Sequence, residues 1–194
     1  MPKKISSKNV AYEGQIIRVE ATNTADGRIF EKASRSPGTR IIIYDEINDQ
    51  ILLSQEYRPE LGETDYRLPG GKVRDKIRDW DEIKDRPDVL SLIGQACMKE
   101  AREEVGMEVE NIELFTNFGS GGPTIGWDLY YFVATKFKAL GKQQLETEED
   151  IKAMWVSSAQ AAVICLSGQM REGRSVAALS QFLYQKGKIQ IRKS

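Results

Sequence analysis

The stretch Lys99-Glu100-Ala101-Arg102-Glu103-Glu104-Val105-Gly106-Met107 places three glutamates close together in front of a glycine. On an α-helix these three positions fall within about a 100° arc, so their carboxylates share one face. Like charges at this spacing repel each other by a few tenths of a kcal/mol per pair, roughly. A helix selected only for stability would avoid this arrangement, which therefore indicates a function.

A divalent cation would turn that repulsion into binding. Carboxylates stacked one helical turn apart can chelate hard cations, which neutralise a diphosphate and activate a water. The alternative is a solvated acidic face on which Lys99 and Arg102 are the neighbouring cations. The metal interpretation is favoured because the opposite helix face is apolar, and because Gly70 and Gly71 precede the helix and can expose backbone carbonyls.

The 194 residues include no histidine, which removes the commonest general base and the commonest soft-metal ligand. Any metal site must therefore use carboxylates and carbonyls, the ligands typical of Mg²⁺, Mn²⁺ or Ca²⁺ rather than Zn²⁺. By the same reasoning, a general base is expected to be an aspartate or a glutamate.

Composition narrows the class of protein further. The net charge is −1 and the pI about 5.8, which argues against a protein that coats nucleic acid. No apolar run reaches the length of a membrane helix, and the first residues lack the apolar segment of a secretory signal. Cys97 and Cys165 are too few for a disulfide framework and are expected to be buried thiols. We therefore expect a cytoplasmic protein with no membrane or nucleic-acid partner.

Periodicity predicts an α/β chain of mixed type. Apolar residues between Val89 and Val105 recur at helical spacing, with Asp88 placed to cap the helix and Gly106 placed to end it. Residues 10–34 read as two strands joined at Ala25-Asp26-Gly27, a hairpin signal. Further strands are expected at 39–44, 51–57, 129–137 and 151–157, and further helices at 159–166 and 175–184. Hairpins and crossovers together predict helices on both faces of a mixed sheet, an α/β/α sandwich.

A charged segment at residues 73–87 interrupts this pattern. Ile77, Trp80 and Ile83 recur at every third position, so a short amphipathic helix is possible. A solvated surface insertion is the alternative.

The glutamate helix and Leu68-Pro69-Gly70-Gly71 together resemble the Nudix box, G-x5-E-x7-R-E-U-x-E-E-x-G-U, in which U is a bulky apolar residue. The residues that match its helical part are Glu100, Glu103, Glu104, Gly106 and Met107. There are three departures: Lys99 replaces the usual arginine, Ser91 stands where the first glutamate is expected, and the loop is longer by about fourteen residues.

The resemblance implies a Nudix fold and a Mg²⁺-dependent pyrophosphohydrolase, with Mn²⁺ as a possible substitute. The implied metal ligands are Glu100, Glu103, Glu104 and Gly70, and Glu103 is also a candidate catalytic residue. Residues 37–194 would form the hydrolase domain, with an insertion at about 73–88. Residues 1–36 would form an N-terminal β-extension.

Other segments resemble ADP-ribose and nucleoside-diphosphate-sugar pyrophosphatases. Gln55-Glu56-Tyr57-Arg58-Pro59 is similar to their segment before the box, and Pro123 lies near their marker proline. The resemblance implies that Arg35, Arg58, Arg67 and Pro123 bind substrate. For Arg58 the alternative is a surface ion pair with Glu56 or Glu60. Arg67 replaces a residue that is often acidic in this subfamily, so substrate identity stays open.

Two loops complete the expected site. Residues 118–124 contain three glycines, which can bring backbone N–H groups close to a ligand or form a flexible turn. Glu146, Glu148 and Glu149 lie in a polar loop, and in the resembled enzymes a glutamate of this loop is a general base or an extra metal ligand. We favour Glu148, then Glu149; a merely acidic loop is the alternative.

The expected reaction is hydrolysis of a nucleoside diphosphate linked to a sugar, with ADP-ribose yielding AMP and ribose 5-phosphate. GDP-mannose, another nucleotide sugar or a dinucleotide is the alternative substrate. A non-catalytic nucleotide sensor on the same fold is the alternative of another class. The resemblance also implies a homodimer, domain-swapped through its N-terminal strands.

Overall fold

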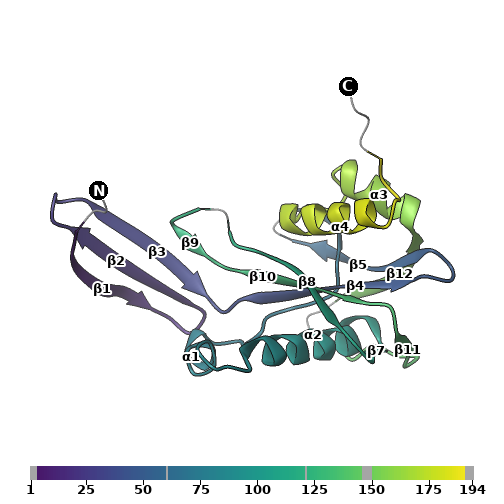
Figure 1. Ribbon diagram of the computed structural model, residues 1–194, viewed down its shortest axis with the longest axis horizontal. Coiled ribbons are helices and arrows are strands. Elements are labelled where there is room, and N and C mark those ends of the chain that lie inside the picture. Colours follow the sequence, from purple (N-terminus) through teal and green to yellow (C-terminus); the bar gives the residue numbers. More distant parts are fainter. Residues whose placement is uncertain (1–3, 60, 121, 146–149, 191–194) are drawn as a thin grey trace.

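The computed structural model describes residues 4–59, 61–120, 122–145 and 150–190, and it has two parts (Figure 1). One part is a layered body, in which a central sheet lies between α2 on one side and α3 and α4 on the other. The other is a smaller sheet of N-terminal strands that projects from the body.

The central sheet has the strand order β12-β5-β4-β10-β8, with β6 paired to β5. Strand β10 runs parallel to β4, whereas the other neighbouring strands of this sheet are antiparallel, so the sheet is mixed. Its strands are β4 (Gly38–Asp45), β5 (Gln50–Arg58), β6 (Glu63–Arg67), β8 (Glu113–Phe118), β10 (Leu129–Ala134) and β12 (Ile151–Ser157).

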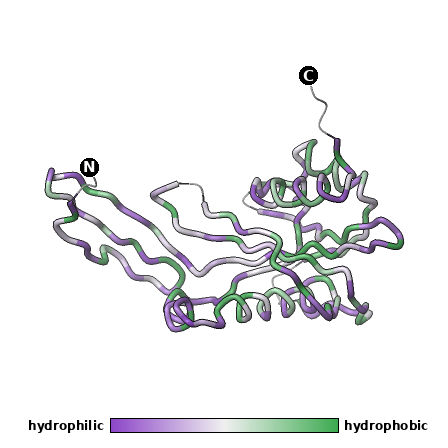
Figure 2. The backbone as a smooth tube through the Cα atoms, viewed as in Figure 1, coloured by the Kyte–Doolittle hydropathy of each residue, from purple (hydrophilic) through white to green (hydrophobic). Residues whose placement is uncertain are grey.

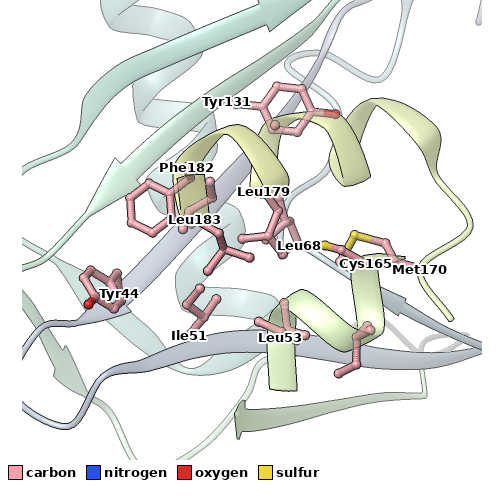
Figure 3. Close-up of a cluster of buried hydrophobic side chains, with 14 of the residues drawn as sticks. Tyr44, Ile51, Leu53, Leu68, Tyr131, Cys165, Met170, Leu179, Phe182 and Leu183 are labelled. Atoms are coloured by element: carbon pink, nitrogen blue, oxygen red, sulfur yellow. The ribbon is translucent and has the colours of Figure 1, made fainter. Parts of the chain in front are cut away.

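Strand β4 shows why helices cover both faces. Side chains alternate between the two faces of a strand, and Ile41 and Ile43 pack with α2 (Val89–Val105), whereas Ile42 packs with α3 (Ser158–Leu166) and α4 (Gly173–Gln185). All three isoleucines are fully buried. Hydrophobic residues accordingly gather along the central strands (Figure 2), and Figure 3 shows Phe182 and Leu183 of α4 above Ile51 of β5. The expected α/β/α sandwich around a mixed sheet is confirmed.

The helix with the three glutamates has the expected bounds. It ends at Gly106, whose φ of 63° lies in the left-handed region and whose N–H donates to the carbonyl of Ala101. Asp88 precedes the helix, but its side chain makes no capping hydrogen bond and pairs with Arg86 at 2.8 Å instead. After the helix, β7 (Met107–Val109) pairs with β11 (Phe137–Ala139). The expected strand at 129–137 is therefore divided between β10 and β11.

The N-terminal segment forms three strands where two were expected, and a fourth strand from residues 125–126 joins their sheet. Its order is β1 (Ile5–Glu13), β2 (Ile17–Thr24), β3 (Ile29–Arg35) and β9 (Ile125–Gly126). The hairpin at Asp26-Gly27 joins β2 to β3 as expected, with Gly27 at φ 82°. The additional turn lies at Gly14, whose N–H donates to the carbonyl of Ile17 at 2.9 Å. A single glycine without a partner such as asparagine or aspartate was too weak a signal for that turn.

The insertion contains a short helix, α1 (Ile77–Asp81), so the helical interpretation is confirmed. Ile77 and Ile83 are buried, and Trp80 packs against the same core cluster as α2. The charged side chains of the segment remain largely exposed.

Both cysteines are buried, as expected. Burial raises the pKa of the Cys97 thiol to about 12 and that of Cys165 to about 11. Within the described part of the chain, no helix is long and apolar enough to cross a membrane.

Candidate active site

The three glutamates line a cavity of about 450 Å³ between α2, the loop after Pro69 and the insertion. The acidic residues that line it are Asp75, Asp79, Glu100, Glu103 and Glu104, and the basic ones are Lys72, Arg74 and Lys99. Five carboxylates against three cations leave an excess of negative charge, which suits a cavity that receives divalent cations.

The two glycines before the insertion lie against two of these glutamates. The N–H of Gly70 donates to Oε2 of Glu104 at 2.6 Å. Gly71 lies so close to Glu100 that a Cβ on Gly71 would be 2.2 Å from Oε1 of Glu100. Glu103 instead forms an ion pair with Lys99, with Nζ and Oε2 at 2.8 Å.

Gly70 itself is held by a buried arginine that the sequence patterns did not single out. Arg40 donates from one terminal nitrogen to the carbonyls of Gly70, at 2.5 Å, and Thr39, at 2.8 Å. The available signal was a cation directly before three isoleucines of a strand. Gly70 thus lies beside Glu104, and its carbonyl, the predicted metal ligand, accepts from a guanidinium in this structure.

Gly71→Ala is expected to abolish most activity while leaving the protein folded. The three atoms nearest the added methyl group all belong to the carboxylate of Glu100, so this flexible side chain would swing away from its place. We expect kcat/KM for the best diphosphate substrate to fall by about 10²-fold, because a 1 Å misplacement in a site can cost that much. Thermal unfolding should shift by no more than a few degrees, and a fully active variant would contradict this assignment.

The donor set fits a hard divalent cation. Every candidate ligand in the cavity is an oxygen, and the carboxylates come from both the helix and the insertion. Among the described residues, no three carboxylates or thiols are already gathered as a ligand cage. Oε2 of Glu103 pairs with Lys99, and Oε2 of Glu104 accepts from the N–H of Gly70.

Two of the predicted substrate-binding arginines lie together on β5 and β6. Arg58 forms an ion pair with Glu56 at 3.1 Å, the alternative considered from the sequence. Arg67 lies 3.6 Å from Asp65 and 3.9 Å from Glu56. Burial lowers the pKa of the Arg67 guanidinium, and the nearby charges of Arg40 and Arg58 lower it further. Arg58 and Arg67 thus share Glu56 as a partner.

Arg35 lies in a stack that the sequence patterns did not reveal. Its guanidinium is 4.6 Å from the ring centroid of Trp127, and that of Arg174 is 4.4 Å from the same centroid. Burial lowers the pKa of Arg35, as does the charge of Arg40. Among described residues, Nε of Arg35 and Nε1 of Trp127 are buried without a hydrogen-bond partner. The three residues are far apart in sequence, so only the fold brings them together.

Pro123 lies at a different place from the glutamates. It lines two hollows, of about 580 and 370 Å³, between β3 and the glycine-containing loop, and Lys32 lines both as well. The loop therefore faces the N-terminal sheet, and the role of Pro123 in binding substrate stays a prediction.

Glu146, Glu148 and Glu149 lie outside the described residues. The residues just before them are attached to the glutamate helix: the N–H of Gln144 donates to the carbonyl of Glu103 at 2.9 Å, and Gln144 lines the cavity. The side-chain amide of Gln143 donates to the carbonyls of Glu104 and, at 2.9 Å, Ile151. The role of Glu148 or Glu149 as general base stays a prediction.

The NUDIX domain profile matches residues 34–177, most of the chain. The chain belongs to the Nudix family. The expected family and enzyme class, a Nudix hydrolase, are thereby confirmed. A solved structure described as an ADP compounds hydrolase has the same fold, with a TM-score of 0.71 and 15% sequence identity. The alignment covers 97% of this Nudix chain and 98% of that one. No curated protein matches the sequence.

Proposed function

We propose that this Nudix protein hydrolyses the diphosphate bridge of a nucleoside diphosphate linked to a sugar, with ADP-ribose as the first substrate. The observation that carries the proposal is the acidic cavity beside α2, into which Glu100, Glu103 and Glu104 face together with cations from the opposite wall. The similar fold of an ADP compounds hydrolase supports an adenosine diphosphate substrate.

In the proposed reaction, water adds to one phosphorus and the P–O–P bond breaks, giving AMP and ribose 5-phosphate. Glu100, Glu103 and Glu104 would hold Mg²⁺, or Mn²⁺ in its place. The metal, when bound, neutralises the diphosphate and makes the attacking water more acidic. Gly70 positions Glu104 through its N–H, and a carboxylate of Glu148 or Glu149 would accept the proton of the water.

The proposed substrate contacts divide between two regions. Arg58 and Arg67 would bind phosphate oxygens, because a planar guanidinium can donate two parallel hydrogen bonds to them. Arg35 would contribute further positive charge at the side of Trp127. Pro123 and its loop would contact the nucleoside, since they line hollows against the N-terminal sheet.

A substrate panel tests the proposal. Purified protein with Mg²⁺ is given ADP-ribose, GDP-mannose, other nucleotide sugars and dinucleotides, and kcat/KM is measured for each. The expected result is the highest kcat/KM for ADP-ribose, with AMP and ribose 5-phosphate as products. If kcat/KM for a hexose conjugate such as GDP-mannose is far above that for ADP-ribose, a nucleotide hexose is the substrate and ADP-ribose is not. Absence of Mg²⁺-dependent turnover on every diphosphate would favour the nucleotide sensor.

We also propose that a second copy of the chain covers the N-terminal sheet. Strand β1 forms one edge of this sheet, and all nine of its residues are exposed. They include Ile5, Val10 and Tyr12, which are at least half exposed. A small sheet needs packing on one face for stability, and an exposed edge strand is a template for pairing with another chain.

The mass in solution tests this dimer. The wild type is expected to have about twice the monomer mass of 21.9 kDa in size-exclusion chromatography with light scattering. The double variant Val10→Asp, Tyr12→Asp should be monomeric at the same micromolar concentration, because two charges would face the partner. Ile47→Asp is the control, since Ile47 is exposed on the β4–β5 turn. A monomeric wild type would refute the proposal.

A further inference from the structure

The insertion forms the wall of the glutamate cavity that faces α2. Its contributions to the lining are Val73, Arg74, Asp75 and Asp79. Across the cavity stand Gln95 and Lys99 of α2 as well as the glutamates. A segment that reads as an addition to the Nudix pattern therefore borders the site of the proposed chemistry.

This wall is fixed at both ends. The N–H of Val73 donates to the carbonyl of Pro37, and that of Ile77 to the carbonyl of Gln15, both at 2.9 Å. Asp81 forms an ion pair with Arg18 of β2 at 2.6 Å. Because Ile77 and Ile83 are also buried, the segment is packed onto the body and can hold a side chain at a defined position.

Arg74 is the arginine that this wall presents to the cavity. Its N–H donates to Oγ of the buried Ser36 at 3.0 Å, which fixes its backbone. The other arginines of the insertion are paired, Arg78 with Glu13 at 3.2 Å and Arg86 with Asp88 at 2.8 Å. Within the described part of the chain, Arg74 forms no ion pair, and its terminal nitrogen donates only to the carbonyl of Val73.

The other two cations of the cavity already have carboxylate partners. Lys99 pairs with Glu103 at 2.8 Å, and Lys72 pairs with Asp75 at 3.2 Å. A diphosphate held by cations on the glutamates would direct its remaining negative oxygens away from α2. A guanidinium on the facing wall matches those oxygens in charge and in geometry.

We infer that Arg74 binds phosphate oxygens of the substrate from the insertion side of the cavity. This inference rests on the proposed function, because it assumes that the cavity receives a diphosphate. It gives the insertion a role in binding, which the Nudix pattern itself does not contain.

Binding of α,β-methylene-ADP, a diphosphate that cannot be cleaved between its phosphorus atoms, tests the inference. Dissociation constants are measured by calorimetry with Mg²⁺ for wild type, Arg74→Ala, Arg74→Lys and Arg86→Ala. Arg74→Ala is expected to bind the analogue about 10- to 100-fold more weakly than wild type, because it loses a charge-assisted, bidentate contact. The dissociation constant of Arg74→Lys should lie between those of Arg74→Ala and wild type. That of Arg86→Ala should lie within about twofold of wild type.

The results separate the inference from the proposed function. If wild type does not cleave ADP-ribose but Arg74→Ala loses affinity for α,β-methylene-ADP, the reaction is wrong and the role of Arg74 stands. If wild type cleaves ADP-ribose and a folded Arg74→Ala binds the analogue as tightly as wild type, the role of Arg74 is refuted. The role of Arg74 is also refuted if wild type does not bind the analogue, or if Arg86→Ala loses as much affinity as Arg74→Ala. If Arg74→Ala fails to fold, the dissociation constant of Arg74→Lys is compared with that of wild type instead.

Discussion

Glu104→Gln is expected to lower kcat on the best diphosphate substrate by about 10²- to 10³-fold, the loss typical when one preorganised electrostatic contact is removed from an active site. Glutamine has almost the same shape and can still accept the hydrogen bond from the N–H of Gly70. It lacks the negative charge that a hard cation requires. The change therefore removes the proposed ligand without removing the contact that positions it.

The measurement is steady-state hydrolysis with increasing Mg²⁺, together with thermal unfolding of the same preparation. Glu108→Gln is the matched control, because Glu108 lies just beyond the helix and pairs with Arg102 at the surface, at 3.1 Å. It should retain nearly full activity. If Glu104→Gln retains wild-type kcat at every Mg²⁺ concentration, Glu104 is not a ligand of a catalytic cation.

Gly70→Ala is expected to destabilise the fold by about 3 kcal/mol or more, because it combines backbone strain with overpacking. Gly70 has φ of 140°, which side chains rarely adopt. A Cβ there would lie 2.2 Å from the carbonyl oxygen of Thr39 and 2.9 Å from Cα of Arg40. Both are backbone atoms of the central strand β4, so a rotamer change cannot relieve the overlap.

Urea unfolding, followed by circular dichroism, measures this loss as a lower midpoint. Gly173→Ala is the control: it lies at the start of α4 with nothing within 4 Å of an added Cβ, and its stability should change by no more than about 1 kcal/mol. An unchanged midpoint for Gly70→Ala would contradict the close approach of the loop to β4. Comparison with Gly71→Ala then separates a glycine needed for the backbone from one needed for Glu100.

The glutamate helix could be predicted from the sequence because its signals are local. Apolar spacing gives the buried face, Gly106 supplies the left-handed stop, and the positions of Glu100, Glu103 and Glu104 follow from the helical period. The Asp26-Gly27 hairpin and the strands of the sandwich could be predicted for the same reason. Each of these features depends on residues a few positions apart.

The surroundings of those glutamates depend on contacts between distant residues, for which the sequence holds no local signal. Arg40 reaches Gly70 because β4 lies beside the loop after β6, and Trp127 meets Arg35 and Arg174 only once β3, β10 and α4 have packed.

The insertion shows both what local sequence signals can predict and what they cannot. Its spacing of Ile77, Trp80 and Ile83 allowed a helix to be predicted, because amphipathic periodicity is local. Its place on the wall of the cavity was decided by burial of Ile77 and Ile83 against the core and by the ion pair between Asp81 and Arg18. The sequence alone determined three carboxylates on one helix face. Only the tertiary structure decided which cations face them, because that depends on how the charged insertion packs onto the sheet.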